Sequence, residues 1–255
     1  MILRKLKLVV RKNIIGVVNS CSSVIPSWFF ELAGFKKRYH LDFEKTFSKL
    51  FSVDRDFKFI QIGANDGVSF DGLYDKVKER KSTGLVVEPS PYYYKLLVDN
   101  YKEIRNVIPV NKAIHKTDRK IHLYELSDIG RAKLPDWGQG IGSFNKEHLL
   151  KFDIKEEDLS AIDVEAIPFS ELIEHPPGFA SIDYLQVDTE GYDAEVINSI
   201  PFDRFNVRMI KFESVNLSSH DKERTKAYLS KNGFVVFEFT EDTIAILKVQ
   251  QLIFK

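Results

Sequence analysis

The chain has 255 residues, of which 44% are hydrophobic and 29% are charged, and its 37 basic side chains balance 37 acidic ones. These values are typical of a soluble globular protein and exclude a fibrous or low-complexity chain. The single cysteine, Cys21, excludes an intramolecular disulfide framework and a cysteine-built zinc site, and it favours a reducing, cytoplasmic compartment. The absence of net positive charge argues against a nucleic-acid partner.

The first 40 residues differ from the rest of the chain in charge. They hold eight basic side chains and one acidic one, so this arm carries +7 and the other 215 residues carry −7. Apolar residues recur at three- and four-residue steps from Ile2 to Val17, which predicts an amphipathic helix with a cationic side. Such a helix packs on its own domain or on a second subunit, or it lies peripherally on an anionic membrane. Polar residues from Asn19 onward interrupt the apolar stretch, which disfavours a signal peptide and a membrane span.

From residue 56 onward, short apolar runs alternate with segments of helical length. Runs of this kind, rich in β-branched residues, predict βαβ crossovers and a mostly parallel sheet with helices on both faces. We therefore expect a basic helical arm over 1–55 and an α/β domain over 56–255. The predicted strands are 59–62, 84–87, 107–110, 120–125, 182–187 and 207–212, and the predicted helices are 91–101, 192–200 and 221–232.

The last part of the chain departs from this alternation. The apolar runs 234–239 and 243–247 are separated by three residues, which can join antiparallel strands and cannot form a parallel crossover. Ser219 or His220 is expected to begin the preceding helix, and Gly233 to end it.

One long segment, 127–165, shows no clear periodicity. It contains Trp137 and several glycines, and long insertions in compact domains are often lids or binding loops. We expect a lid or substrate-binding insertion here.

Chemistry is expected beyond the carboxyl ends of the parallel strands. The first strand is followed by Gly63 and Gly67, in G-x-x-x-G rather than the dinucleotide G-x-G-x-x-G spacing. The second ends at Glu88, whose two acceptor oxygens suit the vicinal hydroxyls of a ribose. A simple turn and a helix-capping glutamate remain alternatives for these two features.

Two further strands end in acidic residues. Asp188 and Glu190 follow the run 182–187, and Glu213 ends the next one. A helix cap at Asp188 and a structural ion pair at Glu213 are competing interpretations. A magnesium ion held by Asp188 and Glu213 is a further alternative, although no two of the six histidines have a metal-binding spacing.

Five motifs in order resemble the FkbM family of S-adenosylmethionine-dependent methyltransferases, over about residues 56–247. The shorter piece Gly140-Ile-Gly-Ser-Phe144 also looks like its counterpart there. The five motifs are Gln61-Ile-Gly-Ala-Asn-Asp-Gly67, Val87-Glu-Pro-Ser-Pro91, Asn111-Lys-Ala-Ile114, Gln186-Val-Asp-Thr-Glu-Gly-Tyr-Asp193 and Lys211-Phe-Glu-Ser214.

The resemblance implies a class I methyltransferase Rossmann-like fold with a seven-stranded, mostly parallel sheet and a C-terminal antiparallel hairpin. It also implies S-adenosylmethionine as the cofactor, with Glu88 at the ribose, Asn111 and Ala113 by the adenine, and Asp188 near the sulfonium. The cofactor-binding residues that it implies are Gly63, Ala64, Asn65, Asp66, Gly67, Glu88, Pro89, Asn111, Ala113 and Asp188.

Relatives methylate hydroxyl groups, which implies an O-methyltransferase acting on a sugar of a polysaccharide or glycoconjugate. A base should then remove the hydroxyl proton, and we expect Asp188, or alternatively Glu190 or Glu213, in that role. Trp137 and the run Tyr92-Tyr93-Tyr94 could offer apolar faces to a sugar ring, or could serve as a lid and as core packing. The alternatives are a small secondary metabolite as acceptor, a non-catalytic cofactor-binding module and an NAD-dependent oxidoreductase.

Overall fold

The computed structural model describes residues 42–69, 72–133, 140–152, 154–239 and 241–248. The predicted helix between Ile2 and Val17, and also Cys21 and Trp137, lie outside the described residues. In chain order the elements are α3 (Phe43–Leu50), β1 (Asp56–Ile62), α4 (Leu73–Lys78), β2 (Lys81–Val87), α5 (Pro91–Tyr101), β3 (Val107–Val110), β4 (Ala113–Ile114), β5 (Lys120–Leu126), α6 (Asp128–Lys133), β6 (Gly142–Ser143), α7 (Lys146–Leu150), the 3-10 helix η2 (Glu156–Asp158), β7 (Leu159–Ile167), α8 (Phe169–Glu174), β8 (Ser181–Val187), α9 (Asp193–Asn198), β9 (Asn206–Glu213), α10 (Ser219–Lys231), β10 (Phe234–Glu238) and β11 (Asp242–Leu247).

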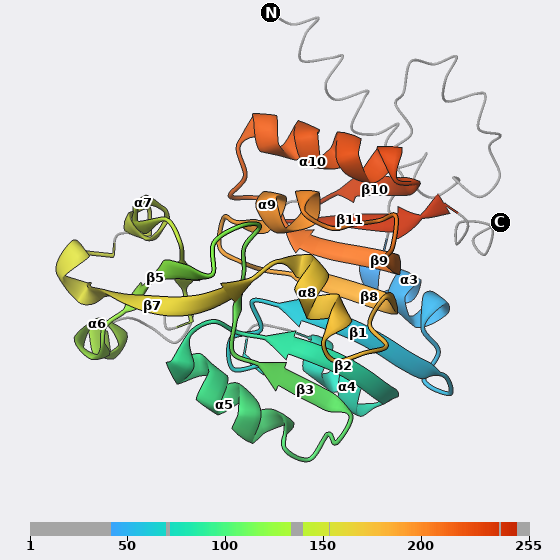
Figure 1. Cartoon of the computed structure of the whole chain (residues 1–255), viewed down its shortest axis with the longest axis horizontal. Helices are drawn as coiled ribbons and strands as arrows, with labels where there is room; N and C mark the ends of the chain where they lie inside the picture. The colour runs from blue at the N-terminus through green and yellow to red at the C-terminus, as the bar shows by residue number, and fades with distance from the viewer. Residues whose placement is uncertain (1–41, 70–71, 134–139, 153, 240, 249–255) are drawn as a thin grey trace, which may run out of the picture. The chain divides into compact units, whose positions relative to one another are not determined.

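Seven strands form one sheet in the order β10-β11-β9-β8-β1-β2-β3 (Figure 1). The pairs β9–β8, β8–β1, β1–β2 and β2–β3 are parallel. Strand β11 pairs antiparallel with both β9 and β10. The predicted mostly parallel sheet with a C-terminal antiparallel hairpin is therefore confirmed.

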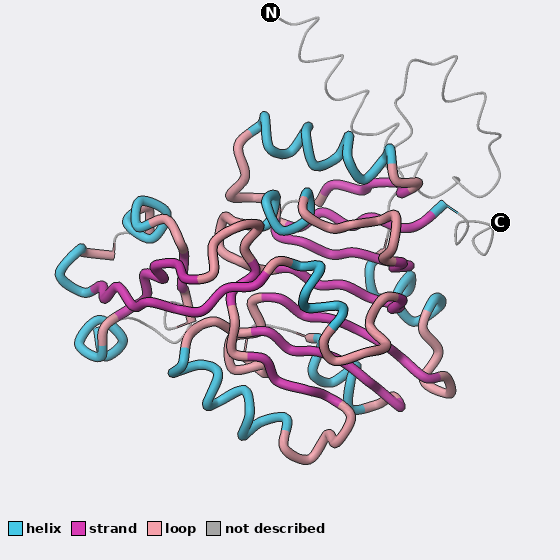
Figure 2. Tube along the Cα trace, in the orientation of Figure 1, coloured by secondary structure: helices cyan, strands magenta, loops and turns pink. Residues whose placement is uncertain are grey.

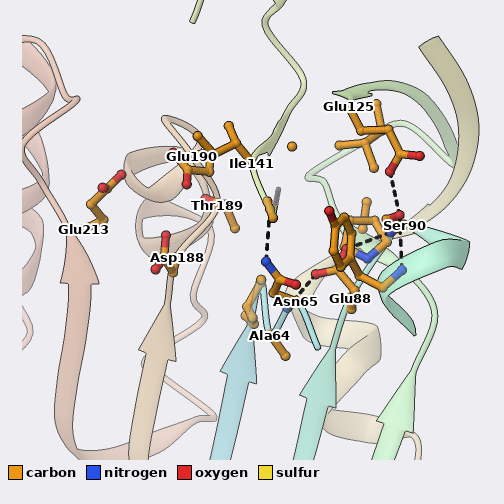
Figure 3. A pocket seen from close by; sticks show the side chains of 18 of the residues that line it. Ala64, Asn65, Glu88, Ser90, Glu125, Ile141, Asp188, Thr189, Glu190 and Glu213 are labelled. Carbon is orange, nitrogen blue, oxygen red and sulfur yellow. Dashed lines mark hydrogen bonds between the residues drawn. The ribbon is translucent and has the colours of Figure 1, made fainter. Parts of the chain in front are cut away.

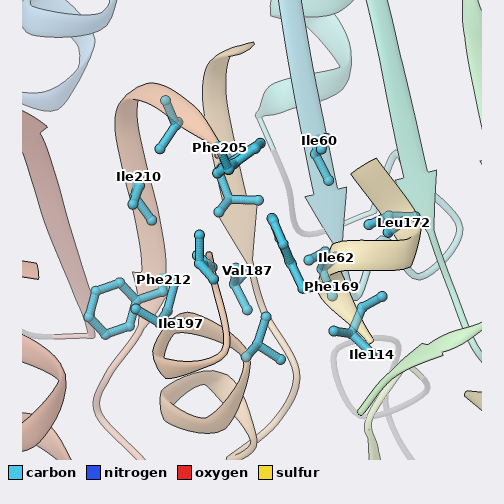
Figure 4. Close-up of a cluster of buried hydrophobic side chains, with 14 of the residues drawn as sticks. Ile60, Ile62, Ile114, Phe169, Leu172, Val187, Ile197, Phe205, Ile210 and Phe212 are labelled. Carbon is cyan, nitrogen blue, oxygen red and sulfur yellow. The ribbon is translucent and has the colours of Figure 1, made fainter. Parts of the chain in front are cut away.

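The central strands are buried on both faces because helices cover each side. On one face, Ile60, Leu185 and Ile210 pack with apolar residues of α8 and α9, such as Phe169 and Ile197 (Figure 4). Burying such side chains is the main favourable term in folding. This explains why the strands appear in the sequence as nearly continuous apolar runs.

The opposite face of the sheet carries an aromatic cluster that includes α3. The ring of Phe47 lies 5.5 Å from that of Phe57 and 5.2 Å from that of Tyr184, both edge-on. Edge-to-face pairs at this spacing stabilise a core beyond the area they bury. Helix α3 lies in the part of the chain assigned to the arm by sequence, but it packs on the sheet; the boundary at residue 55 stays a prediction.

The segment 127–165 is more regular than the sequence indicated. It contains α6, β6, α7, η2 and most of β7. Residues Leu159 to Glu165 of β7 pair antiparallel with the whole of β5. These strands, with β4 and β6, form a second sheet in the order β4-β7-β5-β6, which extends from the seven-stranded sheet (Figure 2). The expectation of an irregular segment was wrong, because β7 alternates exposed Asp163 and Glu165 with buried Val164 and Ala166, which is the pattern of a strand covered on one side.

Helix ends largely follow the sequence signals. Helix α5 begins and ends as predicted, with Ser90 as the N-cap and Pro91 in the first turn. Gly233, with φ of +89°, follows the C-cap of α10 as predicted. Helix α10 begins at Ser219, one of the two residues expected there, and its N-cap is Ser218, whose hydroxyl accepts a hydrogen bond from the Asp221 N–H. Among the described residues, no helix has the length and apolar character to cross a membrane.

Candidate active site

The turn after β1 brings three strand ends together. The N–H groups of Gly63 and Ala64 both donate to the Val87 carbonyl at the end of β2, at 2.9 and 3.0 Å, and the Asp188 N–H donates to Ile62 at 2.9 Å. Gly63 has φ of +76°, and a Cβ there would lie 1.6 Å from the Asp188 carbonyl oxygen. Only glycine permits this approach, so the close contact with β8 explains why the first residue of the G-x-x-x-G motif is a glycine.

A pocket of about 650 Å³ opens above these strand ends, within the usual range for small-molecule sites. Two groups of carboxyl side chains line it (Figure 3). We call the first the Glu88 end, with the carboxyl groups of Glu88 and Glu125 and the Ser90 hydroxyl that lies with them. We call the second the acidic end, with Asp188, Glu190 and Glu213. Ala64 and Asn65 lie between them.

Glu88 is buried and is held by backbone donors. One carboxylate oxygen accepts the Asn65 N–H and the other accepts the Ser90 N–H, each at 2.8 Å. Burial raises the pKa of Glu88 to about 7, and the nearby Glu125 adds to the shift, while the two N–H donors oppose it. Each oxygen keeps a second acceptor position, which suits the two hydroxyls of a ribose.

Other predicted cofactor residues support the pocket from behind. Asn111 donates through Nδ2 to the carbonyls of Glu88 and Pro89, at 2.8 and 3.0 Å, so it holds the loop after β2. The Asp66 carboxylate accepts the N–H groups of Val68 and Ser69.

Gly67 has a packing role. A Cβ on it would meet side chains of α5 at 2.5 Å. Gly67, Asp66 and Asn111 are not among the residues that line the pocket, whereas Pro89 and Ala113 are.

The acidic end brings together the three predicted catalytic candidates. Burial raises the pKa of Asp188 well above its usual value, and the charges of Asp193, Glu190 and Glu213 add to the shift, although its side chain faces the open pocket. Burial also raises the pKa of Glu213, and repulsion from Glu190 is the second cause of this shift. Behind them, burial raises the pKa of Asp193 to about 7. Asp188, Asp193 and Glu213 therefore bind protons more strongly than free carboxyl groups do.

The alternatives to catalysis at these acids find limited support. Thr189 is tied to Asp193, whose carboxylate accepts its hydroxyl at 2.9 Å, and Asp188 does not cap α9. Glu213 accepts Asn216 Nδ2 at 3.0 Å. Among the described residues, no group of three or more His, Cys, Asp or Glu side chains is arranged to hold a metal.

Several contacts around the pocket were not anticipated from the sequence. Ser90 donates its hydroxyl to Glu125 of β5 at 2.5 Å, and Asn65 Nδ2 donates to the Gly140 carbonyl at 3.1 Å. His148 of α7 lies with Nε2 3.3 Å from a carboxylate oxygen of Glu190. Each contact joins residues at least 35 positions apart, and no spacing in the sequence signals such pairs.

The tyrosines after Pro91 have different surroundings. Tyr92 is half exposed, and the Arg131 guanidinium lies over its ring at 4.3 Å. Tyr93 is buried and lines the pocket. His122 is exposed and pairs with Asp163 on the neighbouring strand β7.

The sheet order and the position of the pocket define a Rossmann-like methyltransferase of class I. Residues 61–236 match the methyltransferase FkbM domain. The chain belongs to the FkbM methyltransferase family and, as such, is an S-adenosylmethionine-dependent methyltransferase.

Several solved structures are similar to the chain at low identity. The methyltransferase FkbM from Methylobacillus flagellatus KT has a TM-score of 0.48 and 12% identity, over 78% of this chain and 45% of that one. The fibrillarin of Aeropyrum pernix with bound S-adenosyl-L-methionine has a TM-score of 0.43 and 12% identity, over 77% and 69%. The precorrin-6y C5,15-methyltransferase of Geobacter metallireducens GS-15 has a TM-score of 0.40 and 15% identity, over 84% and 95%. No curated protein matches the chain.

The pocket fits this cofactor. Glu88 offers free acceptor positions at one end, and the acidic end suits a ligand that carries positive charge on sulfur and nitrogen. Repulsion among the carboxyl groups there would be relieved by such a cation. The binding of a positively charged cofactor therefore explains why carboxyl groups that repel one another are gathered at this end of the pocket.

Proposed function

We propose that this protein transfers a methyl group to a hydroxyl oxygen on a sugar of a polysaccharide or glycoconjugate. The supporting observation is the acidic end, where three carboxyl groups share one side of the pocket and the pKa values of Asp188 and Glu213 are raised. Carboxyl groups at this end can accept the hydroxyl proton as the new bond forms. A neutral alcohol requires such a base because it is a weak nucleophile.

The chemistry places definite demands on the chain. When bound, S-adenosylmethionine supplies a methyl group on a positively charged sulfur. The hydroxyl oxygen forms the new bond to carbon as the bond from carbon to sulfur breaks and its electron pair returns to sulfur. The hydroxyl proton passes to Asp188, Glu190 or Glu213. Alignment of the reacting atoms can supply ~7–11 kcal/mol of the barrier, and Glu88 contributes to it by orienting the ribose.

The cofactor contacts remain part of this proposal. Gly63, Ala64 and Asn65 border the methionine part of the cofactor, Glu88 and Pro89 the ribose, and Ala113 the adenine. Asp66, Gly67 and Asn111 act by holding the surrounding loops.

The charge of the pocket favours an uncharged, hydroxyl-rich acceptor. Among the described residues that line it, Lys112 is the one cationic side chain, against six acidic ones. A phosphate or carboxylate near the reacting carbon would be repelled, whereas sugar hydroxyls can donate to carboxylates and pair with amides such as Asn216. This argument supports a neutral saccharide over an anionic acceptor.

The test is methyl transfer from isotopically labelled S-adenosylmethionine to a panel of neutral saccharides, their uronic acids and small phenolic metabolites. We expect label on a neutral saccharide, in a bond stable to base, as an ether is. Label confined to phenols would move the acceptor to secondary metabolites. Failure to transfer to any acceptor, with normal binding of S-adenosylhomocysteine, would favour a non-catalytic module.

The arm over residues 1–55 supports a second proposal, that the protein associates peripherally with anionic membranes. Its +7 charge is the supporting feature. Full-length protein should sediment with vesicles containing phosphatidylglycerol, and Arg4→Glu with Lys5→Glu and Lys7→Glu should weaken this. Equal sedimentation of both proteins, or of neither, would contradict the proposal.

A further inference from the structure

Two non-glycine residues among those described adopt a positive φ, Asn65 at 52° and Glu190 at 49°. Both line the pocket. Asparagine tolerates the left-handed region, but a glutamate has no such preference, so its conformation must be imposed by its surroundings. Unfavourable backbone conformations of this kind concentrate at functional sites.

The conformation of Glu190 is imposed by the insertion. The hydroxyl of Ser143, in β6, donates to the Glu190 carbonyl at 2.8 Å, across 47 positions of sequence. His148, in α7, approaches the Glu190 carboxylate at 3.3 Å. The next residue, Gly191, also faces the imidazole, since a Cβ there would lie 3.4 Å from Nδ1. The backbone and the side chain of Glu190 are thus both held by the β6–α7 segment.

His148 is built in firmly. It is 4% exposed, and its ring packs edge-on against Phe152, with 5.3 Å between centroids. A carboxylate only accepts hydrogen bonds, so the contact with Glu190 requires a proton on Nε2 of His148. His148 does not line the pocket, whereas Glu190 does. The imidazole therefore acts on the pocket through Glu190.

Glu190 differs from Asp188 and Glu213 because its carboxylate is in hydrogen-bond contact with a histidine, His148. Burial and mutual repulsion strengthen the hold of Asp188 and Glu213 on their own protons. Three carboxyl groups this close cannot all be ionised easily. The His148 N–H holds one oxygen of the Glu190 carboxylate in place at the edge of the pocket, and this fixed orientation singles out Glu190 among the three acids.

We propose that Glu190 is the catalytic residue that takes the proton of the acceptor hydroxyl, and that His148 is its positioning residue. The proton moves from the hydroxyl to a Glu190 oxygen while the oxygen–carbon bond forms and the carbon–sulfur bond breaks. The proposal rests on the proposed transfer to a hydroxyl group. In this proposal the insertion also positions the catalytic base through Ser143 and His148, in addition to lining the pocket.

The kinetic test uses the saccharide methylated in the panel. Glu190→Gln keeps the size of the side chain and an acceptor for His148, and it should lower kcat by ~10²–10⁴-fold, with the affinity for S-adenosylhomocysteine unchanged within about threefold. Glu195→Gln, on the exposed part of α9, is the matched control and should keep full activity. A kcat of Glu190→Gln within threefold of the wild type would overturn the proposal.

The role of His148 is tested by removing and restoring its donor. His148→Phe keeps a ring against Phe152 and should lower kcat by roughly 10–100-fold, the value of one charge-assisted hydrogen bond, with KM changed less than about threefold. His148→Gln restores an N–H donor and should recover most of that loss. His122→Phe, at a histidine–carboxylate pair away from the pocket, should change neither constant. Equal losses in the Phe and Gln variants of His148 would contradict a positioning role.

A spectroscopic test needs no acceptor. At fixed pH, Glu190→Gln should shift the Nε2 nitrogen resonance of His148, whereas Glu195→Gln should leave it in place. An unchanged resonance in Glu190→Gln overturns the pairing, whatever the kinetics show. If no saccharide is methylated, the proposed function fails, and this measurement still decides whether His148 and Glu190 form a unit.

Discussion

The two ends of the pocket are built from different parts of the chain. At the Glu88 end, the carboxylate is held by N–H groups of Asn65 and Ser90, which directly follow β1 and β2. At the acidic end, Glu190 is held by Ser143 and His148 from the insertion, 47 and 42 positions away. The backbone donors that hold Glu88 come from loops of the seven-stranded sheet, whereas the groups that hold Glu190 come from a segment outside that sheet.

This difference suggests how acceptor choice and cofactor binding are separated. The loops after β1 and β2 leave the sheet at neighbouring positions, so their geometry follows from parallel pairing. The insertion is attached to that frame and can change without disturbing it. Substitutions in β6 and α7 should therefore alter turnover, whereas those after β1 and β2 should alter cofactor binding.

The largest expected effect is the change of the free energy of unfolding with pH. It compares one buried acid at the Glu88 end, Glu88, with one behind the acidic end, Asp193. The pKa values of Glu88 and Asp193 are raised to about 7, from usual values of 4.5 and 3.8. The folded protein therefore binds more protons than the unfolded chain, and its free energy of unfolding falls as pH rises from about 4.5 through 7. At about 1.36 kcal/mol per pKa unit, Glu88 should account for roughly 3 kcal/mol and Asp193 for roughly 4 kcal/mol.

This is measured by urea unfolding of the cofactor-free protein between pH 5 and pH 8. Glu88→Gln and Asp193→Asn should each flatten the dependence. A free energy of unfolding that rises over this range would contradict the assignment of raised pKa values to both ends.

The second prediction tests the junction between the ends. Gly63→Ala places a Cβ against the Asp188 carbonyl and should lower the free energy of unfolding by more than about 3 kcal/mol. Gly178→Ala is the matched control, since its φ is +101° but nothing lies within 4 Å of the added Cβ, and it should lose about 1 kcal/mol. Equal losses by denaturant unfolding would show that strain alone, and not the close approach of β1 and β8, requires Gly63.

The third prediction separates the ends by ligand binding. Glu88→Ala removes the ribose acceptor and leaves the Asn65 and Ser90 N–H groups without their partner, so Kd for S-adenosylhomocysteine should rise by roughly 100-fold. Calorimetric titration measures this, with Glu195→Gln as the surface control. A rise below about threefold would remove Glu88 from the cofactor site.

The smallest expected effect tests whether the separation is complete. Gly140 of the insertion accepts a hydrogen bond from Asn65, and a Cβ on it would lie 1.9 Å from that amide nitrogen. Gly140→Ala should raise Kd for S-adenosylhomocysteine by about tenfold, near 1.4 kcal/mol. Gly142→Ala is its control, since its added Cβ would make only an ordinary contact at 3.5 Å. No difference between the two variants would mean that the insertion leaves the cofactor end undisturbed.

Much of the fold could be predicted because its signals are local. Buried parallel strands appear as apolar runs, and Ser90 with Pro91 marks the start of α5. Errors arose where local signals were ambiguous or weak. The predicted helix 221–232 begins in fact at Ser219, with Ser218 as the cap that the packed helix reveals. Strand β7 was missed because its alternation of apolar and charged residues is short, from Ile162 to Ala166.

The sequence by itself determined the sheet, its terminal hairpin, and the positions of Glu88, Asp188, Glu190 and Glu213 at strand ends. These follow from hydrophobic periodicity and from the rule that parallel strands end at one edge. Only the tertiary structure decided that His148 contacts Glu190, and that Ser90 contacts Glu125. Such contacts depend on how the insertion packs, and packing is decided by side chains far apart in the chain, whose proximity no local pattern encodes.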